Sequence, residues 1–300
     1  MPEIRNLTAT DQLERDWLES GLFKLAEELR RQKSTNSLAG KSLYCLFYEP
    51  SFLTRTSFER AIGLLGGTAY HTEDASQFYP VRTPSYVDNI ISILASLHID
   101  LVVLRSSEPG VVERAVAVDA LPVINGGSLD DHPTQALADL CTLNLDLGGI
   151  DGVQIAVVGR LEHRNVSALL KGLALFDEVK VTLIPFSGQA DPAVVSYCEQ
   201  RGVRLTTSED IESVRDADAI YLNGPRTVAH AQLLRARGSF KLRVDADFMA
   251  KLRPHCVILD PMQRSGDFPI EVEDSRFAFY RQAENALFTR MALLNQMLGA

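Results

Sequence analysis

The sequence predicts an α/β protein with two doubly wound parallel-sheet domains joined by bridging helices. Short apolar runs rich in β-branched residues alternate with longer helical patterns along almost the whole chain. Several of these runs are continuously apolar, which is typical of strands buried on both faces of a parallel sheet. In addition, 300 residues are more than one hydrophobic core usually organises, so two domains are expected.

The expected strands and helices follow one another in regular alternation. In the first half of the chain, the apolar runs predict strands at Leu43–Tyr48, Thr68–His71, Leu101–Leu104 and Val123–Asn125. In the second half, they predict strands at Ile155–Val158, Val181–Pro185, Arg204–Thr207, Ala219–Asn223 and Cys256–Leu259. The helical patterns between strands include Phe52–Leu65, Tyr86–Leu97, Val111–Val118 and Asn165–Phe176.

The domain boundary is expected in Asp146–Gly152, DLGGIDG, because its glycines end the helix that begins near His132. Residues 1–148 would then form the first domain, and residues 149–284 would form the second. A final helix within residues 285–300 is expected to pack back on the first domain.

Composition argues against several classes of protein. The formal charge of −9 and the pI near 5.2 make nucleic acid a poor partner, because phosphate binding needs clustered Lys and Arg. No apolar run is long enough to span a membrane and the N-terminus lacks a signal-peptide pattern, so a cytoplasmic protein is expected. Cysteines without C-x-x-C spacing predict buried free thiols and no metal site; they are Cys45, Cys141, Cys198 and Cys256.

Polar side chains follow three of the strands expected in the first half. The carboxyl ends of parallel strands are where open α/β sheets bind ligands. Taken singly, each residue has a structural explanation, such as a helix N-cap for Ser51 or a surface ion pair for Arg105. Their coincidence favours a binding site made of Ser51, Thr54, Arg55, Arg105, His132 and Gln135.

Such a site suits an acyl phosphate. Arg105 would bridge the phosphate and the acyl oxygen, while Thr54 and His132 would donate to the oxygen that becomes an oxyanion. The side-chain oxygen of Gln135 would accept from an amide NH₂ group. Ser51 and Arg55 would complete the anion site at a helix N-terminus, where unpaired N–H groups favour negative charge.

Three motifs resemble the aspartate and ornithine carbamoyltransferase family, and aspartate carbamoyltransferase catalytic chains in particular. The stretch Glu49–Glu59, EPSFLTRTSFE, is similar to the family's phosphate loop. The strand LVVLR, which ends at Arg105, resembles its arginine-ended strand, and His132–Gln135, HPTQ, resembles its HPTQ helix. The resemblance implies transfer of a carbamoyl group from carbamoyl phosphate to an amino acid, without a cofactor, in a homotrimer with shared active sites. Arg82 would replace the lysine of a loop that a neighbouring subunit donates.

The second half carries weaker matches to the same family. Arg164 would match the arginine that holds the α-carboxylate of the acceptor amino acid. Arg226 lies two positions beyond the place of the arginine that binds the acceptor's side chain, and it would take over that role.

Two further segments complete the resemblance. Leu259–Arg264, LDPMQR, resembles the family's H-P-L-P-R turn, and the backbone at Pro261 and Met262 would accept from the carbamoyl NH₂ group. Gln282–Ala286, QAENA, resembles the segment that opens the last helix, for which a structural role is expected.

One departure from the family pattern leaves the donor substrate open. In the phosphate loop, Leu53 stands where the family has an arginine that binds phosphate. Three hypotheses account for this change. Arg55 and Arg82 compensate for the lost charge, or the enzyme uses a different substrate with an amide or ureido head, or the protein keeps the fold without catalysis.

Overall fold

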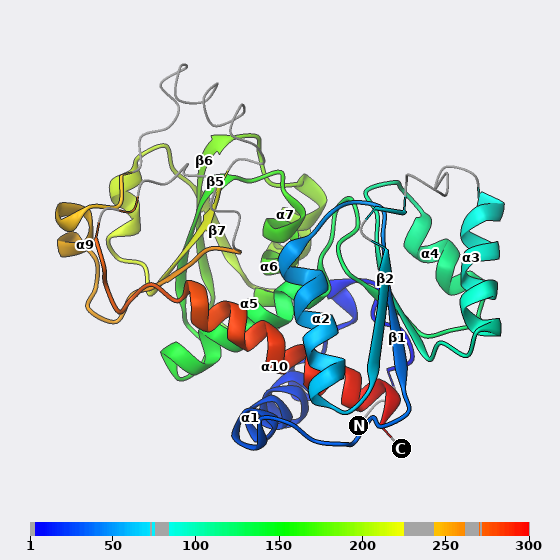
Figure 1. Ribbon diagram of the computed structural model, residues 1–300. Helices are drawn as coiled ribbons and strands as arrows, with labels where there is room; N and C mark the ends of the chain where they lie inside the picture. Colours follow the sequence, from blue (N-terminus) through cyan, green and yellow to red (C-terminus); the bar gives the residue numbers. More distant parts are fainter. Residues whose placement is uncertain are drawn as a thin grey trace. The chain divides into compact units, whose positions relative to one another are not determined.

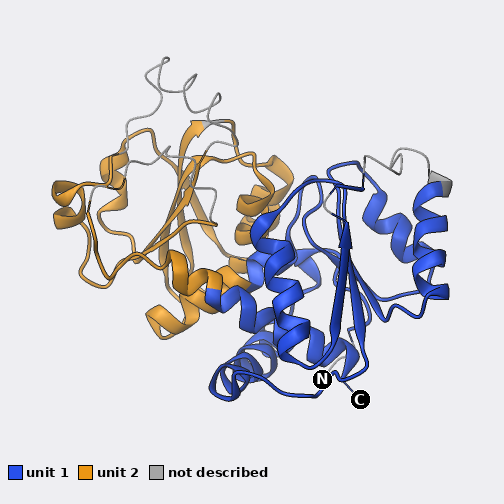
Figure 2. Cartoon of the chain, viewed as in Figure 1, with its two compact units in different colours: residues 1–137, 284–300 blue, residues 138–283 orange. Residues whose placement is uncertain are grey.

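A computed structural model describes residues 4–72, 74–75, 84–224, 243–261, 270 and 272–299. The chain divides into two compact units, shown in different colours in Figure 2. Unit 1 comprises Met1–Leu137 and Glu284–Ala300, and unit 2 comprises Ala138–Ala283. The structure therefore divides the chain within a helix, whereas the sequence analysis places the boundary after that helix.

Unit 1 is built on a parallel sheet with the strand order β2-β1-β3-β4. Its strands are β1 (Ser42–Phe47), β2 (Thr68–Thr72), β3 (Leu101–Arg105) and β4 (Val123–Asn125). The helices of this part are η1 (Thr10–Gln12), η2 (Trp17–Leu22), α1 (Phe23–Gln32), α2 (Phe52–Leu64), α3 (Pro84–Ser96) and α4 (Val111–Ala117). Figure 1 shows α2 on one face of the sheet and α3 with α4 on the other.

Strands β1 and β3 of unit 1 are buried on both faces, which explains their largely apolar sequences, whereas the edge strand β2 is largely exposed. On one face, Leu46, Val102 and Leu104 belong to an apolar core that includes Val87 and Ile91 of α3. The alternate residues of the same strands are also buried, namely Leu43, Cys45, Phe47, Leu101 and Val103. Burying apolar area on both faces is the main favourable term for such a sheet.

Residues from both ends of the chain complete unit 1. Near the N-terminus, Leu7 forms a parallel bridge with Ile124, so the first residues extend the sheet beyond β4. Near the C-terminus, the last part of α10 (Phe279–Leu298) belongs to this unit. The indole nitrogen of Trp17 donates to Gln296 at 2.9 Å, and the fully buried Arg290 donates to the hydroxyl of Ser57.

Unit 2 is built on a second parallel sheet, with the strand order β7-β6-β5-β8-β9. Its strands are β5 (Gln154–Arg160), β6 (Lys180–Ser187), β7 (Arg204–Thr207), β8 (Ala219–Asn223) and β9 (Val257–Leu259). Its helices are α6 (Arg164–Leu173), α7 (Pro192–Gln200), η4 (Ile211–Val214) and α9 (Ala246–Lys251). In Figure 1, α6 and α7 lie on one side of this sheet and α9 lies on the other.

Two helices continue from one unit into the other along the chain: α5 (Pro133–Leu147) contains the 137/138 boundary, and α10 contains the 283/284 boundary. The predicted class of two doubly wound parallel sheets with bridging helices is confirmed. Every expected strand is present, with shifts of a few residues at the ends. Strand β5 extends to Arg160 because Gly159, at φ +123°, allows a register shift that keeps the strand paired with β6.

No helix in the described part of the chain is both long and apolar enough to cross a membrane. The four cysteines are buried free thiols.

Asp218 lies directly before β8, and its side chain contacts the first residue of β5 and two residues that precede β9. Its Oδ2 accepts from the backbone N–H of Gln154 at 2.9 Å, and its Oδ1 accepts from Arg253 at 2.6 Å and lies 2.8 Å from His255 Nε2. Burial acts to raise the pKa of Asp218, but the hydrogen bonds from His255, Gln154 and Arg253 outweigh it and lower that pKa below its usual value.

Replacing Asp218 with Asn is expected to lower the free energy of unfolding at pH 7 by about 1–3 kcal/mol, because donors are left without their charged acceptor. A depressed pKa means that the stabilisation is present above the unfolded-state pKa and is lost as the pH falls through the folded-state pKa. Urea denaturation should therefore show a large difference at pH 7 that shrinks as the pH falls below the usual range of an aspartate carboxyl group. The nearby exposed Asp216→Asn is the matched control, and an equal difference at both pH values would contradict this account.

Candidate active site

The first part of the candidate site is the turn between β1 and α2. Helix α2 begins at Phe52, and Ser51 occupies the N-cap position with an extended backbone (φ −152°). Its side chain makes no capping hydrogen bond, so the ordinary role of an N-cap serine is not filled here. The N-terminal turn of α2 therefore keeps backbone donors and a positive dipole end for an anion.

Arg105 and His132 converge on Gly127. Arg105 is the last residue of β3, and its Nη1 donates to the carbonyl oxygen of Gly126 at 3.0 Å. Gly127 has φ +121°, and a Cβ atom there would lie 2.5 Å from Arg105 Nη1 and 3.2 Å from His132 Cδ2. The backbone angle favours glycine at this position, and a Cβ atom there would have to displace the end of the Arg105 side chain.

Thr54 and His132 lie in contact and are buried, with relative exposures of 5% and 3%. Thr54 Oγ1 is 3.4 Å from His132 Nε2, and Thr134 Oγ1 is 3.4 Å from His132 Nδ1. Both distances are long for hydrogen bonds, and the imidazole remains held between two hydroxyl groups. Gln135, also buried, lies in the first turn of α5, where its N–H donates to the carbonyl oxygen of His132.

Asp131 orients the start of α5 and was missed by the sequence analysis. Its Oδ1 accepts from the backbone N–H of His132 at 2.7 Å and from Thr10 Oγ1 at 2.5 Å, and its Oδ2 accepts from the N–H of Thr10 at 2.9 Å. An acidic residue directly before a helix is a recognisable N-terminal signal. Its partner is 121 positions away, so the pairing with Thr10 has no local sequence signal.

The remaining predicted residues of unit 1 differ in their surroundings. Arg55 lies in the first turns of α2, with Nε 3.7 Å from Oε1 of Glu59. His71 Nδ1 lies 2.7 Å from the same carboxylate oxygen, so Glu59 is close to two basic groups. Arg82 falls outside the described residues.

In unit 2, polar residues lie at the carboxyl ends of the neighbouring strands β5 and β8, and the predicted acceptor ligand Arg164 follows β5. Arg164 is the first residue of α6, directly after the turn that follows β5, and it is only 7% exposed. Arg160, at the end of β5, is equally buried, with its Nε 3.7 Å from Glu162. Asn223, at the end of β8, donates to the carbonyl oxygen of Arg160 at 2.6 Å. Two buried arginines thus stand close in sequence at one edge of this sheet, and guanidinium groups form strong hydrogen bonds to carboxylates.

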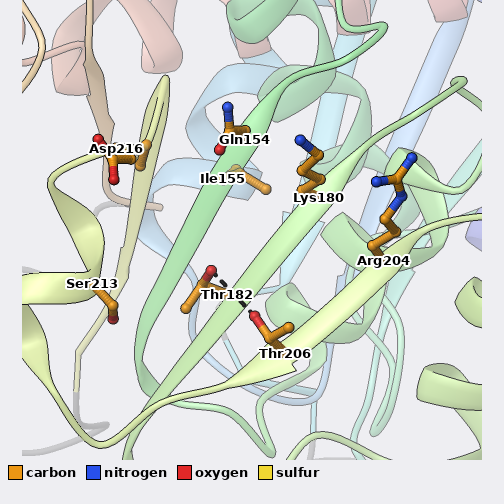
Figure 3. A pocket seen from close by; sticks show the side chains of 9 residues that line it. Gln154, Ile155, Lys180, Thr182, Arg204, Thr206, Ser213 and Asp216 are labelled. Atoms are coloured by element: carbon orange, nitrogen blue, oxygen red, sulfur yellow. Dashed lines mark hydrogen bonds between the residues drawn. The ribbon is translucent and has the colours of Figure 1, made fainter.

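Pro261 is described and buried, directly after β9, whereas Arg226 and Met262 fall outside the described residues. Unit 2 also has a hollow of about 220 Å³ on its sheet, shown in Figure 3. Lys180 and Arg204 stand at the amino ends of β6 and β7 on its rim, and Thr182 Oγ1 lies 3.4 Å from Thr206 Oγ1 within it. None of the predicted site residues lines this hollow.

Comparison with known proteins places these features in a family. Residues 5–144 match the family model of the aspartate/ornithine carbamoyltransferase carbamoyl-P binding domain, and residues 151–297 match that of the Asp/Orn binding domain. This chain belongs to the aspartate/ornithine carbamoyltransferase family. The two motif-bearing halves of the sequence thus correspond to the family's two domains.

Individual relatives are similar to this chain over nearly its full length. A chloroplastic aspartate carbamoyltransferase of Arabidopsis thaliana is 33% identical, over 99% of this chain and 78% of the relative. The aspartate carbamoyltransferase catalytic subunit of Thermococcus gammatolerans is 32% identical, over 92% of this chain and 91% of the relative. The structure of Trypanosoma cruzi aspartate transcarbamoylase in complex with carbamoyl phosphate and aspartate superposes with a TM-score of 0.88 and 26% identity, covering 100% of this chain and 99% of that one.

The predicted family and the prediction of a carbamoyltransferase-like enzyme are confirmed by these matches. The roles of the individual site residues stay predictions. The structure brings together Thr54, Arg105 and His132 through contacts with each other or with Gly127.

Substituting Leu53 with Arg is expected to strengthen binding of inorganic phosphate by at least about tenfold, because a charge-assisted hydrogen bond contributes roughly 1.5–3 kcal/mol. Isothermal titration calorimetry on the purified protein measures this change directly. The control is Phe52→Arg, which adds the same charge at the neighbouring position, where the side chain is 80% exposed. Equal affinity in wild type and Leu53→Arg would refute the placement of residue 53 beside the phosphate.

Proposed function

We propose that this chain transfers the carbamoyl group of carbamoyl phosphate to the amine of an amino acid. The observation that carries the proposal is the convergence of Arg105 and His132 on Gly127, with Thr54 against the imidazole. This cluster lies in the part of the chain that matches the family's carbamoyl-P binding domain.

In the proposed reaction, unit 1 binds the donor. Arg105 neutralises charge on the phosphate and on the acyl oxygen, and the N-terminus of α2 with Ser51 and Arg55 binds the remaining phosphate oxygens. The carboxamide oxygen of Gln135 accepts from the carbamoyl NH₂ group. Holding the donor in one orientation removes most of the entropic barrier to the transfer.

Bond changes then follow at the carbamoyl carbon. The amine nitrogen attacks this carbon, and the former carbonyl oxygen becomes an oxyanion that Arg105, Thr54 and His132 stabilise. The tetrahedral intermediate collapses, the bond from carbon to the phosphate oxygen breaks, and inorganic phosphate leaves. The leaving phosphate accepts the proton that the amine loses, so the mechanism requires no protein base.

For the acceptor, we propose Arg164 as the ligand of the α-carboxylate, on the strength of its buried position at the start of α6. Arg226 would bind the acceptor's side chain, and the backbone at Pro261 and Met262 would accept from the carbamoyl NH₂ group, as the family resemblance implies. The relatives are named for aspartate, which makes aspartate the first acceptor to test.

We also propose a homotrimer with shared active sites, in which Arg82 reaches the site of a neighbouring subunit. Family resemblance supports this assembly. The cytoplasm stays the expected compartment, although several plant relatives are chloroplastic.

The proposal is tested by calorimetric titration with carbamoyl phosphate, followed by an assay for ureido product against a panel of amines that begins with aspartate. Binding and product formation are expected. Binding of a non-phosphorylated amide in place of carbamoyl phosphate would instead favour the amide or ureido substrate that Leu53 suggests. The absence of both binding and product would refute carbamoyl transfer.

The Arg105→Met variant is expected to lower kcat by at least about 100-fold, because it removes charge stabilisation from the oxyanion while keeping an unbranched side chain. A steady-state assay with saturating carbamoyl phosphate measures the effect. Arg114→Met is the control, since Arg114 of α4 forms an exposed ion pair with Asp88 of α3 and is not one of the candidate site residues. Equal loss in both variants would indicate a general effect of removing arginine.

A further inference from the structure

A buried hydrogen-bond network in unit 2 joins helix α5 to the backbone that follows β9. Asp139 of α5 is at its centre and has no exposed surface. Its Oδ2 accepts from the hydroxyl of Tyr221 at 2.9 Å, and its Oδ1 accepts from Nε2 of Gln282 at 2.6 Å. Oε1 of Gln282 accepts in turn from the backbone N–H of Asp260 at 3.0 Å.

The chemistry of the groups fixes the direction of these hydrogen bonds. A backbone N–H only donates, so Gln282 must present its oxygen to Asp260 and its NH₂ group to Asp139. Burial, and then the nearby charge of Asp139, raise the pKa of Tyr221, which keeps the phenol protonated and able to donate. An ionised carboxylate accepts both bonds, and bonds to a charged acceptor are the stronger kind.

Gln282 binds the backbone of Asp260, which lies just beyond the described pairing of β9 with β8. The described pairing of β9 with β8 ends at Tyr221 and Leu259, one residue before Asp260. Pro261 follows and has no N–H to donate. The side chain of Gln282 therefore binds the backbone between the last ladder pair and the proline, where Asp260 is 3% exposed.

We propose that Gln282, oriented by Asp139, is a positioning residue for carbamoyl transfer. It fixes the peptide that joins Asp260 to Pro261, and with it the carbonyl group of Pro261, which binds the carbamoyl NH₂ group under the proposed function, on which this inference rests. Misplacing a binding group by about 1 Å can lower an enzymatic rate by roughly 100-fold. A segment that continues from a strand end needs such an anchor.

Gln282→Met removes both hydrogen bonds at nearly constant volume, and Gln282→Glu places two carboxylates against each other. Both variants are expected to lower kcat at least about tenfold, as loss of one strong hydrogen bond implies. The KM for the amino acid should change less than threefold, roughly, because its carboxylate ligands are untouched. The matched control is Tyr221→Phe, which removes a bond to the same carboxylate and leaves the bond between Gln282 and Asp260 in place. It should retain kcat even where its stability falls.

The double variant Asp139→Asn with Gln282→Glu exchanges donor and acceptor. The amide introduced at position 139 can donate to the carboxylate introduced at position 282 and accept from Tyr221, while the second oxygen of that carboxylate accepts from the N–H of Asp260. All three hydrogen bonds and the single negative charge are thereby restored, so kcat should recover most of the loss seen in Gln282→Glu. If the network only stabilised the fold, folded Gln282→Glu protein would keep its kcat. The double variant would then restore the midpoint of unfolding and nothing else.

Hydrogen exchange at the Asp260 amide gives a readout that does not depend on activity. Protection is expected in wild type, Tyr221→Phe and the double variant, and reduced protection in Gln282→Met. Folded Gln282 variants with unchanged kcat would overturn the inference, as would a wild-type Asp260 amide that exchanges freely. A wild-type protein that forms no ureido product would instead refute the proposed function, whatever the exchange data show.

Discussion

Parallel pairing of the described strands is the constraint on which the rest of the structure depends. It brings the carboxyl ends of β1, β3 and β4 to one edge of the first sheet, and those of β5, β8 and β9 to one edge of the second. In each unit, the candidate site residues lie at strand ends or in the turns and helix starts that follow them. Each unit can therefore bring polar side chains from distant parts of the sequence to one edge of its own sheet.

Strand positions alone do not fix the orientation of the site side chains. Specific residues in the turns after the strands help to hold them. Gly127 leaves the space in which Arg105 and His132 approach each other, and the carboxylate of Asp131 holds the first N–H of the His132 turn. In the second unit, Gln282, which is held by Asp139, accepts from the backbone N–H of Asp260 after β9. Asp131 accepts in the same way from the backbone N–H of His132 before α5. In each case a buried acceptor satisfies a backbone donor that regular secondary structure leaves without a partner.

The sequence predicted what depends on local pattern and missed what depends on distant contacts. Continuous apolar runs predicted the central strands, such as β3, β5 and β8, because these strands are buried on both faces. Thr54, Arg105 and His132 were predicted as site residues because each comes after an expected strand. The place of Gly127 beside the side chains of Arg105 and His132 depends on the folded structure and has no local sequence signal. The partnership of Asp131 with Thr10, and that of Asp139 with Gln282, join residues more than a hundred positions apart, which no periodicity reveals. Gln282 was accordingly expected to have a structural role only.

The discontinuity of unit 1 has a consequence for how the protein is made. Synthesis on a ribosome runs from the N-terminus, and the first domain of a chain usually folds first. Here unit 2 is one continuous segment, whereas unit 1 also needs the part of α10 that carries Arg290 and Gln296, which is translated after the whole of unit 2. Before then, the surfaces around Trp17 and Ser57 lack the helix that contacts them. All residues of unit 2 are therefore synthesised before the last segment of unit 1. Until that segment emerges, unit 1 lacks the part of α10 that packs against it.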